Sequence, residues 1–220
     1  MSLLSLAIAN VKGHNTERLP VSLSSGLGGI GGFGGVAESS SRTDQLGAMT
    51  SSGWLFAVID RISTAVAASE WQLFRKQGRE DKVEVEEHLI LDLWDMPNPF
   101  YPRYEFLEAS VNHFSLVGEM WWVIVRDKTF RIPVEIWPVR PDRMRPIPHP
   151  TDYISGYVYQ VGNEKVFLDI EDVIFIRRPH PLDPYRGIGP IGSIFLDLGS
   201  EKAAAQFTAN FPRESGQLND

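Results

Sequence analysis

A proline-rich stretch near the middle of the chain restricts the fold more than any other feature of the sequence. Residues 132–150 contain six prolines, at positions 133, 138, 141, 146, 148 and 150. Proline lacks an N–H group and clashes with the preceding helical turn, so no helix can run through this stretch, and edge strands and turns are expected. Residues 120–125, just before it, are apolar on both faces of a strand and predict a buried central strand.

Other strands follow from alternating or continuous apolar residues. Residues 71–75 alternate like a strand that pairs with Val83 and Val85. Gly162 and Asn163 mark a hairpin turn between two of the later strands. After the central strand, strands are expected at residues 134–139, 157–161, 165–167 and 173–176.

Helical spacing of apolar residues predicts four helices. Ser51 or Ser52 is expected to cap the first, and Gly118 to end the third. The four helices are expected at residues 54–69, 88–95, 102–117 and 190–210. Helices, then a run of strands, then a helix favour an α+β fold with helices packed on a mixed or antiparallel sheet.

Composition excludes several classes of protein. The 220 residues are 43% hydrophobic, which is enough for a sizeable core. The absence of cysteine excludes a disulfide scaffold, a thiolate zinc site and a cysteine nucleophile. A net charge of −7 argues against a protein that coats nucleic acid by charge alone. No apolar run approaches the roughly 18 residues of a membrane span, and no signal peptide is expected because no basic residues precede the apolar N-terminus.

The N-terminal 50 residues differ from the rest because glycine and serine dominate their centre. Ordering residues 26–35 and 39–41 costs much backbone entropy and buries few side chains, so residues 1–50 are predicted to form a flexible arm. The glycine run contains G-x-G-x-x-G at Gly26, Gly28 and Gly31. A nucleotide site of this kind needs a strand before the motif and a helix after it, and neither is expected here, so the flexible arm is favoured. Residues 51–211 form the predicted α+β region, and residues 212–220 a separate tail.

No catalytic, cofactor-binding or metal-ligating residue is expected. No phosphate-binding loop and no G-x-S-x-G motif occurs. The histidines are scattered without a metal-binding spacing, at positions 14, 88, 113, 149 and 180. A hydrolase built from scattered histidines and aspartates is therefore the least favoured function.

Tryptophans and arginines supply the candidate binding surfaces. The tryptophans lie at positions 54, 71, 94, 121, 122 and 137, and such rings can stack on sugars or bases. The tryptophans therefore leave open an alternative function, a carbohydrate- or peptide-binding module. This alternative predicts a stable monomer whose tryptophan fluorescence responds to ligand. Four of the six lie in apolar patterns typical of a core, and Trp121 and Trp122 point to opposite faces of one strand. The arginines expected to contact DNA or a neighbouring subunit are Arg140, Arg143, Arg145 and Arg186.

Several short blocks are jointly specific in their order and spacing. The three most distinctive are P-N-P at residues 97–99, L-x-G-E-x-W at 116–121 and R-G-I-G-P-I at 186–191. Over about residues 50–210 the series resembles the N-terminal half of portal proteins of tailed double-stranded DNA bacteriophages.

The resemblance implies a wing-like α+β domain and a structural function without catalysis. Members of this family form a dodecameric ring at one capsid vertex, through which DNA is pumped in and later leaves. The implied partners are other copies of the chain, the terminase large subunit, capsid or scaffold proteins, head–tail adaptor proteins and double-stranded DNA. The implied location is the virion, after assembly in the bacterial cytoplasm, and no cofactor or membrane is implied.

Two departures from the family concern the end of the chain. Portal proteins are normally about twice as long, and their stem, clip and crown follow the last helix predicted here. Residues 212–220 also differ from the family's continuation after residue 211. We expect a truncation near residue 211, by a frameshift or premature stop in a decaying prophage. A genuinely short portal-like protein and a gene-model error are the alternatives.

Overall fold

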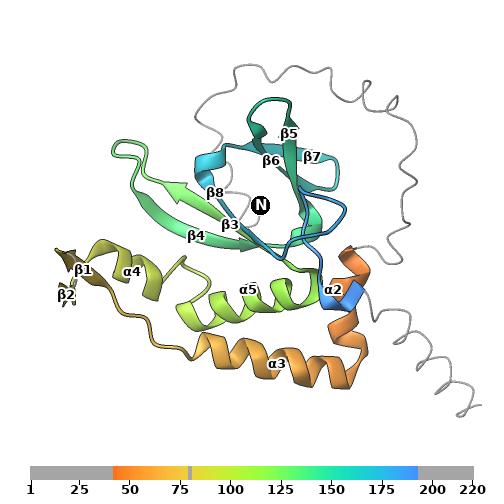
Figure 1. Cartoon of the computed structure of the whole chain (residues 1–220), viewed down its shortest axis with the longest axis horizontal. Helices are drawn as coiled ribbons and strands as arrows, with labels where there is room; N and C mark the ends of the chain where they lie inside the picture. Colours follow the sequence, from red (N-terminus) through yellow and green to blue (C-terminus); the bar gives the residue numbers. More distant parts are fainter. Residues whose placement is uncertain (1–41, 79–80, 193–220) are drawn as a thin grey trace, which may run out of the picture.

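The computed structural model describes residues 42–78 and 81–192, which form a layer of helices beside antiparallel strands (Figure 1). The helices are α2 (Arg42–Ser51), α3 (Gly53–Ala67), α4 (Leu89–Asp95) and α5 (Arg103–Val117). The strands are β1 (Phe74–Gln77), β2 (Asp81–Glu84), β3 (Glu119–Arg126), β4 (Pro133–Val139), β5 (Met144–His149), β6 (Tyr153–Val161), β7 (Glu164–Leu168) and β8 (Val173–Arg177). This architecture confirms the predicted α+β class.

Helix α2 corrects the predicted N-terminal boundary. The sequence places residues 42–50 in a flexible arm, and this is wrong because they form a helix that contacts α3 and α5. Ala48 is buried in one cluster with Leu55 and Ile59 of α3, and Leu46 and Met49 pack against that cluster. Tertiary packing of this kind, rather than intrinsic propensity, stabilises short helices. The rest of the predicted arm, residues 1–41, lies outside the described residues.

The other predicted helix ends agree with the structure. Ser52 is the N-cap of α3, and its hydroxyl oxygen accepts a hydrogen bond from the backbone N–H of Leu55 at 3.4 Å. Gly118 ends α5 in the left-handed conformation, with φ of 78°. The helix predicted at residues 190–210 begins at Pro190, and its course beyond Gly192 lies outside the described residues.

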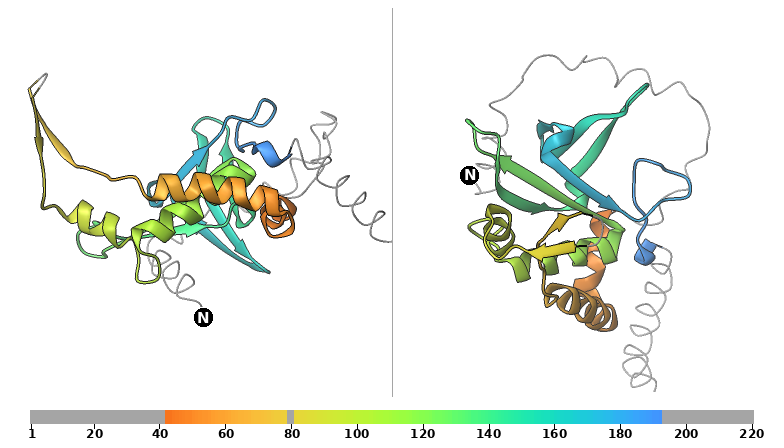
Figure 2. Two further views of the ribbon diagram at one scale, coloured as in Figure 1. Left: turned by 90° about the horizontal axis from the view of Figure 1, so that it is seen from below. Right: turned by 60° about the vertical axis from the view of Figure 1, so that its left-hand side comes forward.

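The predicted pairing of residues 71–75 with Val83 and Val85 is confirmed in part. Strands β1 and β2 pair antiparallel with Arg75 opposite Val83, and the N–H of Val85 donates to the carbonyl of Leu73 at 2.8 Å. The strand itself begins at Phe74, because Trp71 instead packs edge-on against Trp94 with ring centroids 5.0 Å apart. Both strands are exposed throughout, and the hairpin extends away from the rest of the molecule (Figure 2).

The P-N-P turn between α4 and α5 holds the helices against an edge of the sheet. The buried side-chain amide of Asn98 donates to the carbonyl of Ile136 in β4 at 2.8 Å. Its oxygen accepts hydrogen bonds from the N–H groups of Phe100 and Tyr101, at 3.0 and 2.8 Å. The N–H of Ile136 donates to the carbonyl of Pro97 at 2.6 Å. The P-N-P turn therefore satisfies both backbone groups of Ile136 at the open edge of β4, its carbonyl through Asn98 and its N–H through Pro97.

Two three-stranded antiparallel sheets follow α5, in the orders β4-β3-β8 and β5-β6-β7. Strand β3 is central, as its apolar run predicts. Strands β4 and β5 are edge strands, which is where the structure tolerates Pro138, Pro146 and Pro148. The predicted hairpin turn between β6 and β7 is confirmed, with Gly162 at a φ of 59°.

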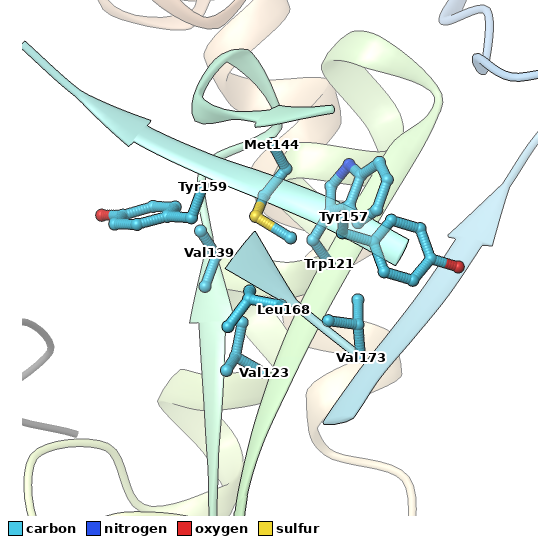
Figure 3. Packing of buried hydrophobic residues seen from close by; sticks show 8 residues of the cluster. All are labelled: Trp121, Val123, Val139, Met144, Tyr157, Tyr159, Leu168 and Val173. Carbon is cyan, nitrogen blue, oxygen red and sulfur yellow. The ribbon is translucent and has the colours of Figure 1, made fainter. Parts of the chain in front are cut away.

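The main core lies between the two sheets. Its buried residues come from both, and they are Trp121, Val123, Val139, Met144, Tyr157, Tyr159, Leu168 and Val173 (Figure 3). Trp121 stacks on Phe175 with ring centroids 3.5 Å apart. On the opposite face of β3, Trp122 packs against Phe106 of α5 and its indole N–H donates to the hydroxyl of Ser110 at 2.8 Å. The predicted opposite orientation of Trp121 and Trp122 is therefore confirmed, and both faces of β3 are covered.

Candidate functional site

Two of the distinctive sequence blocks meet in space at the start of β3. The L-x-G-E-x-W block supplies Glu119, and the R-G-I-G-P-I block supplies Arg186 and Gly187. Backbone hydrogen bonds join the same segments, because the N–H of Arg178 donates to the carbonyl of Gly118 at 2.8 Å. Ile191, four residues beyond Gly187, enters the helical core cluster with Leu55.

The carboxylate of Glu119 is the centre of this junction. Its side chain has no exposed surface. One carboxylate oxygen accepts hydrogen bonds from the Nε of Arg186 at 3.0 Å and from the N–H of Gly187 at 2.6 Å. The other oxygen accepts from the Nη2 of Arg186 at 2.9 Å and from the indole N–H of Trp121 at 3.1 Å. Arg42 of α2 lies 3.7 Å away, so a buried negative charge is compensated from three segments.

Arg186 has an internal role in the described structure, and its expected contact with DNA or a neighbouring subunit stays a prediction. Its side chain is only 12% exposed. Besides the two bonds to Glu119, it donates to the carbonyls of Met144 at 2.8 Å and Pro141 at 3.3 Å. Burial lowers the pKa of Arg186, while the adjacent carboxylate of Glu119 opposes this effect. The guanidinium thereby joins the two sheets through β3 and β5.

Close backbone contact at the junction requires glycine. A β-carbon added to Gly187 would overlap the carbonyl oxygen of Gly118, and one added to Gly189 would overlap that of Leu116. Gly118 itself has a positive φ and lies against the backbone of Ile188. The glycines of the two blocks therefore allow the turn before Pro190 to lie directly on the end of α5.

Glu119 was not predicted as a site residue, although the sequence around it carries one signal. Glu119 stands between the helix-ending Gly118 and the apolar run 120–125. A carboxylate adjoining a strand that is buried on both faces needs a charged or donor partner. The pattern indicates a buried partner for Glu119, but it does not identify Arg186 as that partner.

The three other predicted arginines lie near an open cleft of about 490 Å³ between α2, β5 and the loop before Gly187. Arg140 forms two hydrogen bonds with Asp142, at 3.0 and 2.8 Å. Asp142 also accepts a 3.3 Å bond from the hydroxyl of Thr43 in α2. Arg145 lines the cleft and is exposed, and Arg143 is half-buried in the preceding turn. Neither makes a side-chain hydrogen bond or ion pair within the described part of the chain.

The tryptophans do not form a common binding surface. Trp121 and Trp137 are buried, and Trp122 and Trp94 pack in the cluster beside α5. Trp54 and Trp71 are exposed but lie at opposite ends of α3. Trp54 stands at its start, and Trp71 follows its end. The expected use of most tryptophans in the core is thus confirmed.

Within residues 42–78 and 81–192, no cluster of three histidine, aspartate or glutamate side chains is arranged to hold a metal ion. No helix in the same ranges is long and apolar enough to cross a membrane. The described site is an internal ion-pair junction that connects sheets and helices.

Comparison with protein families identifies the chain. Residues 54–219 match the family described as phage portal protein, and the chain therefore belongs to the phage portal protein family, whose role is structural. The match includes residues 212–219, so it does not support the predicted separation of a tail at residue 212. No curated protein sequence matches the chain.

Similar solved structures come from phage-like particles. A chain in the neck of an empty GTA particle, computed with C6 symmetry, is 25% identical with a TM-score of 0.68, covering 78% of this chain and 46% of that one. A chain in the neck of the native GTA particle, computed with C12 symmetry, is 23% identical with a TM-score of 0.63, covering 79% and 46%. A chain in the virion of the native gene transfer agent particle is 20% identical with a TM-score of 0.66, covering 94% and 50%. This chain spans about half the length of each.

We predict that Arg186→Met destabilises the fold by about 3–5 kcal/mol, because it leaves the buried carboxylate of Glu119 without its main partner. Adding Glu119→Gln should recover part of this loss, since it removes the uncompensated charge. The free energy of unfolding from urea denaturation measures both effects. Arg145→Met is the matched control at an exposed position of the same cleft, and we expect a change within about 0.5 kcal/mol. Equal losses for Arg186→Met and Arg145→Met would contradict the assigned role.

We also predict a pH dependence from His113 of α5. Its Nδ1 atom is buried without a hydrogen-bond partner. Burial lowers the pKa of His113 from 6.5 to about 4, with a smaller opposing effect of Asp142. Between these values the unfolded chain binds a proton that the folded chain does not. The contribution of neutral His113 to the free energy of unfolding is therefore complete above pH 6.5 and is lost as the pH falls toward 4.

The loss should reach at most roughly 3 kcal/mol in the free energy of unfolding. Urea denaturation of the wild type and of His113→Leu across pH 7 to 4 measures it. The variant should lack this part of the pH dependence, and identical pH profiles for the two proteins would disprove the assignment.

Proposed function

We propose that this chain forms the wing region of a portal ring subunit at the capsid vertex. The observation that carries the proposal is the portal family match over residues 54–219. The likeness of the fold to chains in the neck of GTA particles supports it. A ring of copies of this chain would join head and tail and would let DNA pass during packaging and ejection.

The proposed partners follow from this position in the particle. They are other copies of the chain, the terminase large subunit, capsid or scaffold proteins, adaptor proteins and double-stranded DNA. The subunit would act in the virion after assembly in the bacterial cytoplasm, and it would have no catalytic activity. The net charge of −7 fits a channel in which DNA must slide, because many strong phosphate contacts would hold it.

Ring formation by the purified full chain tests the proposal. We expect closed rings in negative-stain electron micrographs and a sedimenting species much larger than 24.7 kDa. A protein that stays monomeric as its concentration is raised would contradict the ring. A monomer whose tryptophan fluorescence responds saturably to a carbohydrate or peptide would instead support a binding module.

Arg143 and Arg145 are the proposed contacts with the DNA backbone, since neither guanidinium is engaged by the described residues. In Arg143→Gln/Arg145→Gln the affinity for double-stranded DNA should fall for all sequences alike. The slope of log K against log salt should decrease by about 0.9 per lost contact. Arg75→Gln, at an exposed arginine of β1, is the control and should leave the slope unchanged. If the double variant forms fewer rings but keeps the wild-type slope of log K against log salt, these arginines contact a neighbouring subunit.

A further inference from the structure

Helix α3 carries a continuous apolar stripe on the side that no described element covers. Its members are spaced four residues apart along the whole helix, and are therefore neighbours on its surface. Their exposed fractions are 85% for Trp54, 56% for Val58, 46% for Ile62 and 38% for Val66. The stripe thus turns gradually from the solvent side toward the packed side of the helix.

The packed side of α3 adjoins the stripe, because each residue that directly follows a stripe residue in the sequence is buried. These buried residues are Leu55, Ile59, Ser63 and Ala67, and among the described elements α3 packs chiefly against α2 and α5. The 15-residue helix contains two charged residues, Asp60 and Arg61. A surface helix normally carries charged or polar residues outside its buried face, whereas a helix that is apolar all round is buried. The composition of α3 therefore predicts a second layer of protein over the stripe.

The position of α3 determines what kind of layer can reach it. The helix runs along one border of the molecule, parallel to its longest axis, with α5 between it and the strands (Figure 1). The β1–β2 hairpin of the same chain extends away from the body and does not return over the helix (Figure 2). With Arg61 as its one cation, α3 does not suit a nucleic acid or an anionic surface.

We propose that the α3 stripe is a contact with a second copy of this chain. The inference rests on the proposed ring. In a ring of identical subunits every copy presents the same stripe along the same border, so one repeated contact covers all of them. The contact is heterologous, because a closed ring joins two different surfaces of neighbouring subunits. The matched chains in particles computed with C6 and C12 symmetry support such a cyclic arrangement.

Trp54→Asp in the full chain is the first test. Trp54 is the most exposed member of the stripe and the second residue of α3, where an aspartate suits the positive end of the helix dipole. The monomer should therefore keep its thermal unfolding transition. The protein concentration at which rings assemble should rise by about tenfold or more. Phe130→Asp is the matched control, since Phe130 is 76% exposed in the β3–β4 turn, and it should assemble like the wild type.

Thiol labelling of Val58→Cys is the second test, and the absence of native cysteines makes it specific. The new thiol should react quickly with a maleimide in monomers and slowly in rings, while Phe130→Cys should react quickly in both. Slow labelling in monomers would mean that residues of the same chain cover the stripe, and would overturn the inference. If the wild type forms rings and Trp54→Asp assembles equally well, the inference is overturned and the proposed function stands. A wild-type chain that forms no rings would overturn both.

Discussion

The buried ion pair between Glu119 and Arg186 is the interaction on which the arrangement of the domain depends. A carboxylate with no exposed surface is costly unless it is neutralised and fully hydrogen-bonded, and Glu119 receives four hydrogen bonds. Arg186 also donates to two carbonyls, those of Pro141 before β5 and Met144 at the start of β5. Satisfying one charge therefore brings together the end of α5, both sheets and the turn that leads to Pro190.

Strand β3 connects the two cores of the molecule, because one of its faces packs in each. Trp121 lies in the core between the sheets, and Trp122 lies in the core beside α5. The chain leaves β3 for the edge strand β4, where Asn98 and Pro97 of the P-N-P turn satisfy the carbonyl and the N–H of Ile136. In a ring subunit, such doubly anchored elements would keep the outer surface of α3 in a fixed position relative to the sheets.

The sequence predicted most of the fold but only part of the candidate site. The central strand, the hairpin at Gly162 and the ends of α3 and α5 follow from local patterns and are confirmed. Helix α2 was missed because its order depends on Ala48 packing against α3 rather than on its own propensity. The bonds between Arg186 and Glu119 were not predicted, because an arginine in a glycine-rich turn gives no local sign of a buried partner.

The sequence by itself determined that residues 132–150 could not form an α-helix, that residues 120–125 would form a central strand, and that Gly118 would end a helix. Each of these depends on backbone chemistry or on side chains within one turn or strand. Only the tertiary structure decided that Arg186 neutralises Glu119, which precedes it by 67 residues. It also decided which side of α3 is left uncovered. Both depend on which distant segments meet, and periodicity within one segment carries no information about that.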